Sequence, residues 1–259
     1  MHHPQTNIHP KSRIGKDVTI DAFSSIHENV EIGDGTWIGS NVTIMNGARI
    51  GKNCNIFPGS VISAIPQDLK FGGEDSLAII GDHTTIREYV TINRGTNYSG
   101  KTTVGKHCLI MAYVHVAHDC IIGNHAILAN SVQLGGHVEI GQHTIIGGVS
   151  AIHQFVKIGS YCMVSGGSLA RKDIPPFIKV GREPLSFAGV NSIGLNRKGF
   201  SDNKVEEIQN IYRLIFNSEL NYTQAIEKVE KEFSISEERN KIINFIRNSS
   251  RGIVKGIIK

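Results

Sequence analysis

Residues 14–44 read IGKDVTIDAFSSIHENVEIGDGTWIGSNVTI, and every sixth residue of this stretch is isoleucine. The same step holds over residues 8–62 without a gap, resumes over 80–92, and then runs over 104–164 with Val, Leu or Ile at each step. A fixed repeat of this kind is the signature of a solenoid, in which each unit packs on its neighbours. The period therefore decides the fold.

A second, smaller residue stands four positions after most of these aliphatic residues, and both point inward with strand alternation. The residues between them form a corner, often with Gly, Asn or Asp, which tolerate positive φ. Three such units close a triangular coil of 18 residues. The sequence predicts an all-β left-handed parallel β-helix of hexapeptide repeats, the handedness being that of the class. The small inward slot holds all four cysteines, which we expect to be buried rather than disulfide-bonded or metal-bound: Cys54, Cys108, Cys120 and Cys162.

Two interruptions of the repeat, near residues 63–79 and 93–103, predict loops. The strands on either side must still stack, so the extra residues have to project from the prism. Further along, Pro175 and Pro176 lack a backbone N–H and are expected to end strand pairing.

Helical spacing of apolar residues begins near Ser201, and Ser201 and Asp202 are plausible N-caps. The sequence thus predicts a β-helix domain over residues 1–190 and a small α-helical C-terminal domain over 191–259. The apolar positions expected to face the helical core are Val205, Ile208, Ile211, Tyr212, Ile215, Ala225, Ile226, Val229, Ile242, Ile243 and Ile246.

Composition and charge narrow the range of partners. The 259 residues carry a formal net charge of +4, which is too small and mixed to indicate nucleic-acid binding. No apolar stretch approaches the roughly 18 residues of a membrane-spanning helix, and no signal peptide is recognisable. We expect a cytoplasmic protein without an integral membrane segment.

Coil register gathers three motifs at one corner of the prism, because residues 18 positions apart lie above one another. His118 falls below Gly136, and Asp119 falls below His137. His115 projects outward from the flat face just before this corner. The motifs HVAHDC, LGGHVE and AIHQF supply His115, His118, Asp119, His137, His153 and Gln154.

Another column of histidines serves as an internal comparison. His107, His125 and His143 also stand 18 residues apart, within GKH, GNH and GQH. They have no neighbouring acid and no glycines beside them that would leave space for a substrate, so we interpret them as ordinary corner residues.

The first corner, by contrast, has the groups that acyl transfer needs. His118 can act as a base near neutral pH, Asp119 can orient it, and the glycines one coil above leave room for a substrate and expose a backbone N–H. Motifs for a covalent acyl-enzyme, such as GxSxG, are absent from the sequence. Direct transfer is therefore favoured.

Eight motifs, in order, resemble the acyl-ACP–UDP-N-acetylglucosamine O-acyltransferases of lipid A biosynthesis over essentially the whole chain: PQDLKF, TINRGT, HVAHDC, GGHVEIG, AIHQFVKIG, DIPPF, GVNSIGL and RKGFS. The resemblance implies transfer of an (R)-3-hydroxyacyl chain from acyl carrier protein to the 3-hydroxyl of UDP-N-acetylglucosamine, without metal or cofactor. It also implies a homotrimer with active sites between neighbouring prisms.

Residue by residue, the resemblance makes His118 the general base, Asp119 its partner and Gly136 the oxyanion donor. It implies that Gly166 gauges acyl length. Substrate contacts by the same resemblance are Asp68, Lys70, His115, His137, His153 and Gln154, with Asn191 and Arg197 as nucleotide contacts.

Two positions depart from the family pattern. Ile193 stands where many members have glutamate, and Lys198 stands where a second arginine is common. Lysine keeps the charge but loses the bidentate fork of arginine. Because acyl carrier protein is acidic, the candidate docking residues are Arg171, Lys172, Lys179 and Arg182.

Three alternatives stay open at this stage. The sister N-acyltransferase usually has an additional N-terminal uridine-binding domain, whereas here the hexads begin at Ile8. A zinc carbonic anhydrase on the same prism has paired ligands five residues apart, a spacing that no two histidines show here. A non-catalytic solenoid that binds a sugar nucleotide would make the corner residues dispensable.

Overall fold

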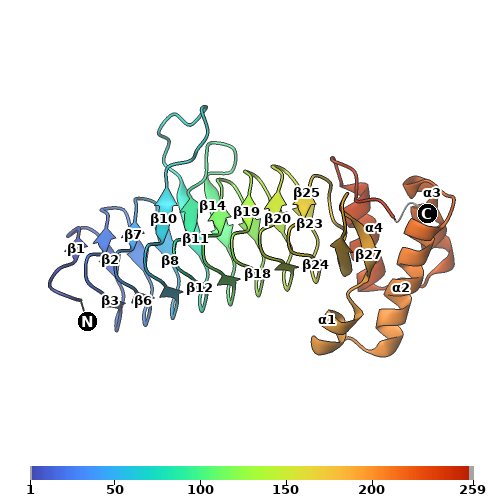
Figure 1. Cartoon of the computed structure of the whole chain (residues 1–259), viewed down its shortest axis with the longest axis horizontal. Coiled ribbons are helices and arrows are strands. Elements are labelled where there is room, and N and C mark those ends of the chain that lie inside the picture. The colour runs from blue at the N-terminus through green and yellow to red at the C-terminus, as the bar shows by residue number, and fades with distance from the viewer. Residues whose placement is uncertain (1, 257–259) are drawn as a thin grey trace.

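The computed structural model describes residues 2–256 and forms a three-sided prism of short strands with helices at its C-terminal end (Figure 1). The first face contains β1 (Asn7–Ile8), β4 (Ser25–Ile26), β7 (Thr43–Ile44), β10 (Val61–Ala64), β13 (Thr91–Asn93), β16 (His115–Val116), β19 (Gln133–Leu134), β22 (Ala151–Ile152) and β25 (Leu169–Ala170). The second face contains β2 (Arg13–Ile14), β5 (Glu31–Ile32), β8 (Ala48–Ile50), β11 (Leu77–Ile80), β14 (Lys101–Val104), β17 (Ile121–Ile122), β20 (Glu139–Ile140) and β23 (Lys157–Ile158). The third contains β3 (Thr19–Ile20), β6 (Trp37–Ile38), β9 (Asn55–Ile56), β12 (Thr85–Ile86), β15 (Leu109–Ile110), β18 (Ile127–Leu128), β21 (Ile145–Ile146), β24 (Met163–Val164), β26 (Ile178–Gly181) and β27 (Ser186–Val190).

Strand register follows the repeat of the sequence. Within the regular part, Ile110 pairs with Leu128, and Leu128 pairs with Ile146, so each coil takes 18 residues. Where the repeat is interrupted, Ile62 pairs with Ile92 and Ile92 with Val116. The extra residues leave the prism between β10 and β11 and between β13 and β14, and Figure 1 shows both loops on the same side. The predicted left-handed parallel β-helix is confirmed.

The core of the prism is filled by stacked aliphatic side chains from all three faces, as the period requires. Ile38, Ile86 and Ile110 have no exposed surface. The four cysteines are free and buried, and burial raises the pKa of the Cys120 and Cys162 thiols to about 12. A thiol with such a pKa is a packing group rather than a nucleophile.

The corners of the prism hold the residues with positive φ. Asp119 has φ 59° and His137 has φ 61°, in the left-handed region that polar corner residues tolerate best. The main-chain N–H of His137 donates to the carbonyl of His118, 3.0 Å away, so successive coils stay in register through the corner. The corner therefore presents side chains from several coils to one side.

Strand pairing continues past Pro175 and Pro176, and the expectation that these prolines end it is wrong. Ile174 bridges to Ile158, and β26 pairs in parallel with β24 before the chain turns back into the antiparallel strand β27. The prolines occupy the corner between these two pairings, where no ladder N–H is required.

Four helices follow: α1 (Ser192–Arg197), α2 (Asp202–Asn217), α3 (Tyr222–Glu232) and α4 (Glu237–Arg247). The buried positions of α2, α3 and α4 include every apolar residue expected there, and the Ser201 side chain caps α2 by accepting from the Lys204 N–H. The C-terminal segment returns to the prism, where Ile253 bridges to Asp173. Over residues 2–256, no helix has both the length and the apolar character needed to cross a membrane.

Two adjacent isoleucines on β17 offer a matched test of the inward and outward positions. Ile122 is 1% exposed and Ile121 is 51% exposed. We expect Ile122→Ala to lower the free energy of unfolding by about 2–5 kcal/mol, because it leaves a cavity in the core. Ile121→Ala should change it by no more than about 0.5 kcal/mol. Urea denaturation at one fixed protein concentration measures both, and equal losses would contradict the assigned register.

Candidate active site

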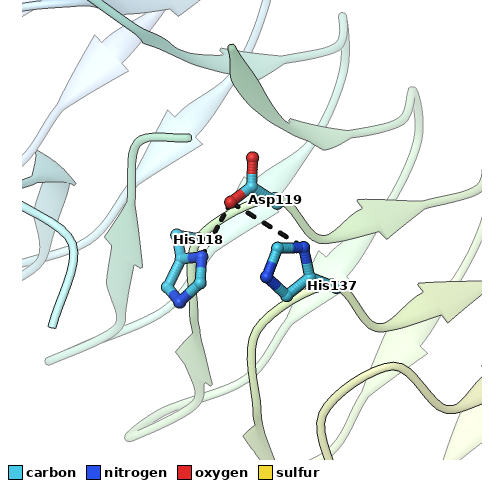
Figure 2. A group of neighbouring side chains, drawn as sticks. All are labelled: His118, Asp119 and His137. Carbon is cyan, nitrogen blue, oxygen red and sulfur yellow. Dashed lines mark hydrogen bonds and ion pairs between the residues drawn. The ribbon is translucent and has the colours of Figure 1, made fainter. Parts of the chain in front are cut away.

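The centre of the corner is a histidine held by a buried carboxylate. His118 Nδ1 lies 2.7 Å from Asp119 Oδ2 (Figure 2). The His118 side chain is 12% exposed, and that of Asp119 is fully buried. An ionised carboxylate only accepts hydrogen bonds, so Nδ1 of His118 carries the proton. Nε2 is therefore the ring nitrogen that can offer the lone pair of a base.

Asp119 is surrounded by hydrogen-bond donors from the loop between β13 and β14. The Thr96 hydroxyl lies 2.7 Å from Oδ2 and the Ser99 hydroxyl lies 2.5 Å from Oδ1. The backbone N–H groups of both residues also donate to the carboxylate. Burial by itself would raise the pKa of Asp119, but the hydrogen bonds from Ser99, His118 and Thr96 together lower it below its ordinary value. Asp119 is accordingly ionised at neutral pH.

Gly136 lies directly against the His118 ring, one coil further along. A Cβ atom at this position would come within 2.6 Å of His118 Cε1 and 2.7 Å of Nε2. Position 136 thus requires glycine, because the His118 ring approaches its backbone too closely for a side chain. Gly136 is buried, and its backbone N–H has no acceptor within the part of the chain that the structure describes. Buried backbone donors nearly always have a partner, so this one is suited to a bound ligand.

His137 forms the second wall of the corner. Its ring meets that of His118 edge to face with centroids 4.9 Å apart, while Phe155 stacks on it at 4.2 Å and Tyr98 contacts it at 4.5 Å. Its Nδ1 is buried without a hydrogen-bond partner and lies 3.9 Å from Asp119 Oδ2 (Figure 2). Burial lowers the pKa of His137, so the ring is neutral at pH 7 and can donate or accept toward a substrate.

The remaining histidines predicted for this corner differ in exposure. His115 is partly buried, with Nδ1 2.7 Å from the Thr91 hydroxyl, and its pKa is lowered by burial and by the charge of His118. His153 and Gln154 are exposed, and His153 Nδ1 lies 3.0 Å from the Gln154 carbonyl.

The first loop, between β10 and β11, contributes Asp68 close enough for its charge to act on His137. The Asp68 carboxylate accepts from the backbone N–H of Lys70, whose side chain is exposed. Glu74 ties the two loops together, accepting from the backbone N–H of Asn97 at 3.0 Å.

Three of the predicted residues stay apart from His118 within one chain. Gly166 lies against Gly148 at another corner of the prism. Asn191 donates from Nδ2 to the carbonyl of Tyr161, and Arg197 is exposed in the last turn of α1.

The column of comparison histidines ends near Asn191, because His143 stacks on Tyr161, whose carbonyl accepts from Asn191. His107, His125 and His143 stack as predicted, with centroids 4.9 and 4.5 Å apart. The stack continues to His83 at one end and Tyr161 at the other. Burial, the neighbouring imidazole and Lys198 lower the pKa of both His125 and His143.

Zinc binding is one of the alternatives that the sequence leaves open. Among residues 2–256, one group has ligand atoms close enough for an ion, namely His118, Asp119 and His137, within 4.8 Å of one another. Each Asp119 oxygen already accepts from several donors, however, and His118 Nδ1 is one of them. These hydrogen bonds hold the His118 ring in place and leave few lone pairs of the carboxylate free for an ion.

Sequence reasoning missed the residues that surround Asp119. Thr96, Ser99 and Tyr98 lie in a segment without repeat, where coil register places nothing. One feature of the sequence could have indicated donors for a buried acid: hydroxyl residues are frequent in the stretch TNYSGKTT.

Two protein-family models match the chain. Residues 29–64 and 101–136 match the bacterial transferase hexapeptide family (six repeats). Residues 173–254 match domain 2 of UDP N-acetylglucosamine O-acyltransferase.

Individual relatives match along most or all of the chain. An acyl-[acyl-carrier-protein]–UDP-N-acetylglucosamine O-acyltransferase of Chlorobaculum parvum is 56% identical over 195 residues, which are 75% of this chain and 74% of the relative. Its counterpart in Thermodesulfovibrio yellowstonii is 42% identical over 254 residues, 98% of each chain. The solved UDP-N-acetylglucosamine acyltransferase of Bacteroides fragilis is 50% identical with a TM-score of 0.97, covering 98% of this chain and all of that one.

Gly136→Ala tests the close approach at the corner. The added methyl group would displace the His118 ring from Asp119, so we expect the ring resonances of His118 to shift in nitrogen–proton correlation spectra. Gly148→Ala is the matched control, because Gly148 occupies the equivalent position at another corner. Unchanged His118 resonances in Gly136→Ala would contradict the assigned packing.

Proposed function

The chain belongs to the acyl-[acyl-carrier-protein]–UDP-N-acetylglucosamine O-acyltransferase family, and from this premise we propose how its corner carries out the reaction. The protein is an acyltransferase that moves an acyl chain from acyl carrier protein to UDP-N-acetylglucosamine. The reaction is transfer of an (R)-3-hydroxyacyl group to the 3-hydroxyl, the first step of lipid A biosynthesis. These relatives favour it over the sister N-acyltransferase and the carbonic anhydrase.

His118 acts as the general base. The observation that carries this assignment is the 2.7 Å hydrogen bond from its Nδ1 to buried Asp119, which leaves Nε2 free to accept a proton. Nε2 takes the proton of the sugar 3-hydroxyl as that oxygen attacks the thioester carbonyl carbon. Asp119 stabilises the imidazolium that results.

Gly136 stabilises the tetrahedral intermediate. Its free backbone N–H donates to the oxyanion that develops from the thioester carbonyl. When the intermediate collapses, the carbon–sulfur bond breaks and the imidazolium returns its proton to the departing thiolate. The products are the O-acylated sugar nucleotide and the free thiol of the carrier.

The side chains around this centre bind the substrates. His137 has an unpartnered Nδ1 and faces the same corner as His118, which suits a sugar hydroxyl. The further contacts in this proposal are Asp68, Lys70, His115, His153 and Gln154.

A neighbouring copy completes the site in a homotrimer. Gly166 lies at another corner of the prism than His118, and Asn191 and Arg197 lie at the two ends of α1, so the proposed trimer brings these residues from a neighbouring copy to the substrate. In the trimer, Asn191 and Arg197 contact the nucleotide and Gly166 lies along the acyl chain. We propose that residues 1–190 form the transferase domain and residues 191–259 the helical domain, of which residues 1 and 257–259 lie outside the part of the chain that the structure describes.

The acidic acyl carrier protein docks on a basic surface beside the end of the prism. The residues in question are all exposed: Arg171, Lys172, Lys179 and Arg182. We place the enzyme in the cytoplasm, the compartment expected from its sequence.

We expect His118→Ala to reduce kcat/KM by about 10²–10⁴-fold, the contribution of a positioned general base. His107→Ala is the matched control, because it removes a corner histidine from the other column and should keep the wild-type rate. Transfer assays with purified protein measure both, alongside circular dichroism to establish that the fold is intact. A folded His118→Ala enzyme with near-normal turnover would refute the assignment.

Gly166→Met tests the proposed gauge of acyl length. The added side chain would occupy the space that the end of a long acyl chain requires, so the preferred 3-hydroxyacyl chain should become shorter. Competition among carrier-bound chains of different length measures the preference. An unchanged chain-length profile would show that the chain runs elsewhere.

A further inference from the structure

The Asp119 carboxylate is bound by one short turn of the second loop, residues 96–99. Its two oxygens accept from the hydroxyl and the backbone N–H of both Thr96 and Ser99, as well as from His118. In addition, the backbone N–H of Asp119 donates at 2.8 Å to the hydroxyl of Thr102, in the strand β14 that follows this loop. The loop is therefore built around this single buried acid.

We propose that Thr96 and Ser99 are positioning residues for the transfer reaction, which hold Asp119 ionised and oriented so that His118 keeps its base nitrogen toward Gly136. The proposal rests on the proposed role of His118. Neither residue touches the reacting atoms, and both act through the carboxylate.

Hydroxyl donors are what this carboxylate needs, because it lacks a cationic partner of fixed charge. The titratable groups that face it are His118, 2.7 Å away, and His137, 3.9 Å away. No lysine or arginine within residues 2–256 pairs with it. Burial disfavours the ionised form of an acid, so its stabilisation falls to these neutral donors.

Losing the donors would change the histidine as well. A protonated Asp119 could no longer hold the Nδ1 proton of His118 in the same way, and the ring would be free to turn or to change tautomer. Misplacement of a reacting group by about 1 Å can cost on the order of 10²-fold in rate.

Other contacts hold the turn in place. The Gly100 backbone N–H donates to the Thr96 carbonyl at 2.8 Å, and Glu74 on the first loop accepts from the Asn97 backbone N–H. The Tyr98 ring packs against His137. A change at one hydroxyl should thus leave the path of the loop intact.

The test uses Ser99→Ala, Thr96→Val and the double variant in the full-length enzyme, with kcat and KM measured as functions of pH. We expect the double variant to lose about 10- to 100-fold in kcat, with KM for UDP-N-acetylglucosamine within about twofold of wild type. The pKa of Asp119 is lowered in the folded protein, so removing donors raises it. The fall in activity on the acid side should then begin at a higher pH, and activity should be partly recovered as pH rises.

Two controls separate this role from a merely structural one. Ser249→Ala removes an equivalent bond, from a serine hydroxyl to fully buried Asp173 at 2.6 Å, remote from the corner, and should leave kcat and the pH profile unchanged. Ser99→Thr keeps a hydroxyl donor and should restore most of the activity lost in Ser99→Ala. If the double variant does not fold, this pair of single variants decides the question.

Wild-type kcat and an unshifted acid limb in folded Ser99→Ala and Thr96→Val would overturn the proposal, provided that His118→Ala is inactive. Equal activity of Ser99→Thr and Ser99→Ala would also contradict it. Activity in His118→Ala would instead refute the proposed function itself.

Discussion

The constraint on which everything else depends is the 18-residue register of the main chain. Each coil donates its strand hydrogen bonds to the next, and each aliphatic side chain stacks on the one below it. A slip of one residue would turn the inward column outward, so the hydrophobic core enforces the register. The same register sets His118 against Gly136 and Asp119 below His137. A packing rule for aliphatic residues thereby assembles a polar site from segments distant in sequence.

The site in turn depends on one buried acid. A carboxylate removed from water is costly unless hydrogen bonds satisfy it, and Asp119 obtains these from a loop that interrupts the repeat. The loop therefore leaves the regular prism at the coil where it can donate hydrogen bonds to the ionised carboxylate of Asp119. The hydrogen bond from the Asn97 backbone N–H to Glu74 joins this loop to the first loop.

The fold and the centre of the site could be predicted from the sequence because both follow from a period. Burial of Cys120, the two loops, and the meeting of His118 with Gly136 all come from counting residues. The contacts of Thr96 and Ser99 with Asp119 could not be predicted by counting residues, because an irregular loop has no register. Pairing beyond Pro176 was missed for a related reason: a proline stops a ladder only where it occupies a ladder position.

Soaking or co-crystallising the protein with UDP-N-acetylglucosamine would show whether His118 faces the sugar 3-hydroxyl. We expect the sugar 3-hydroxyl oxygen to lie within about 2.6–3.2 Å of His118 Nε2, the reach of a general base. We also expect Nδ1 of the same ring to stay hydrogen-bonded to Asp119. A 3-hydroxyl bound to another histidine of the corner, with His118 turned away from the sugar, would contradict this expectation.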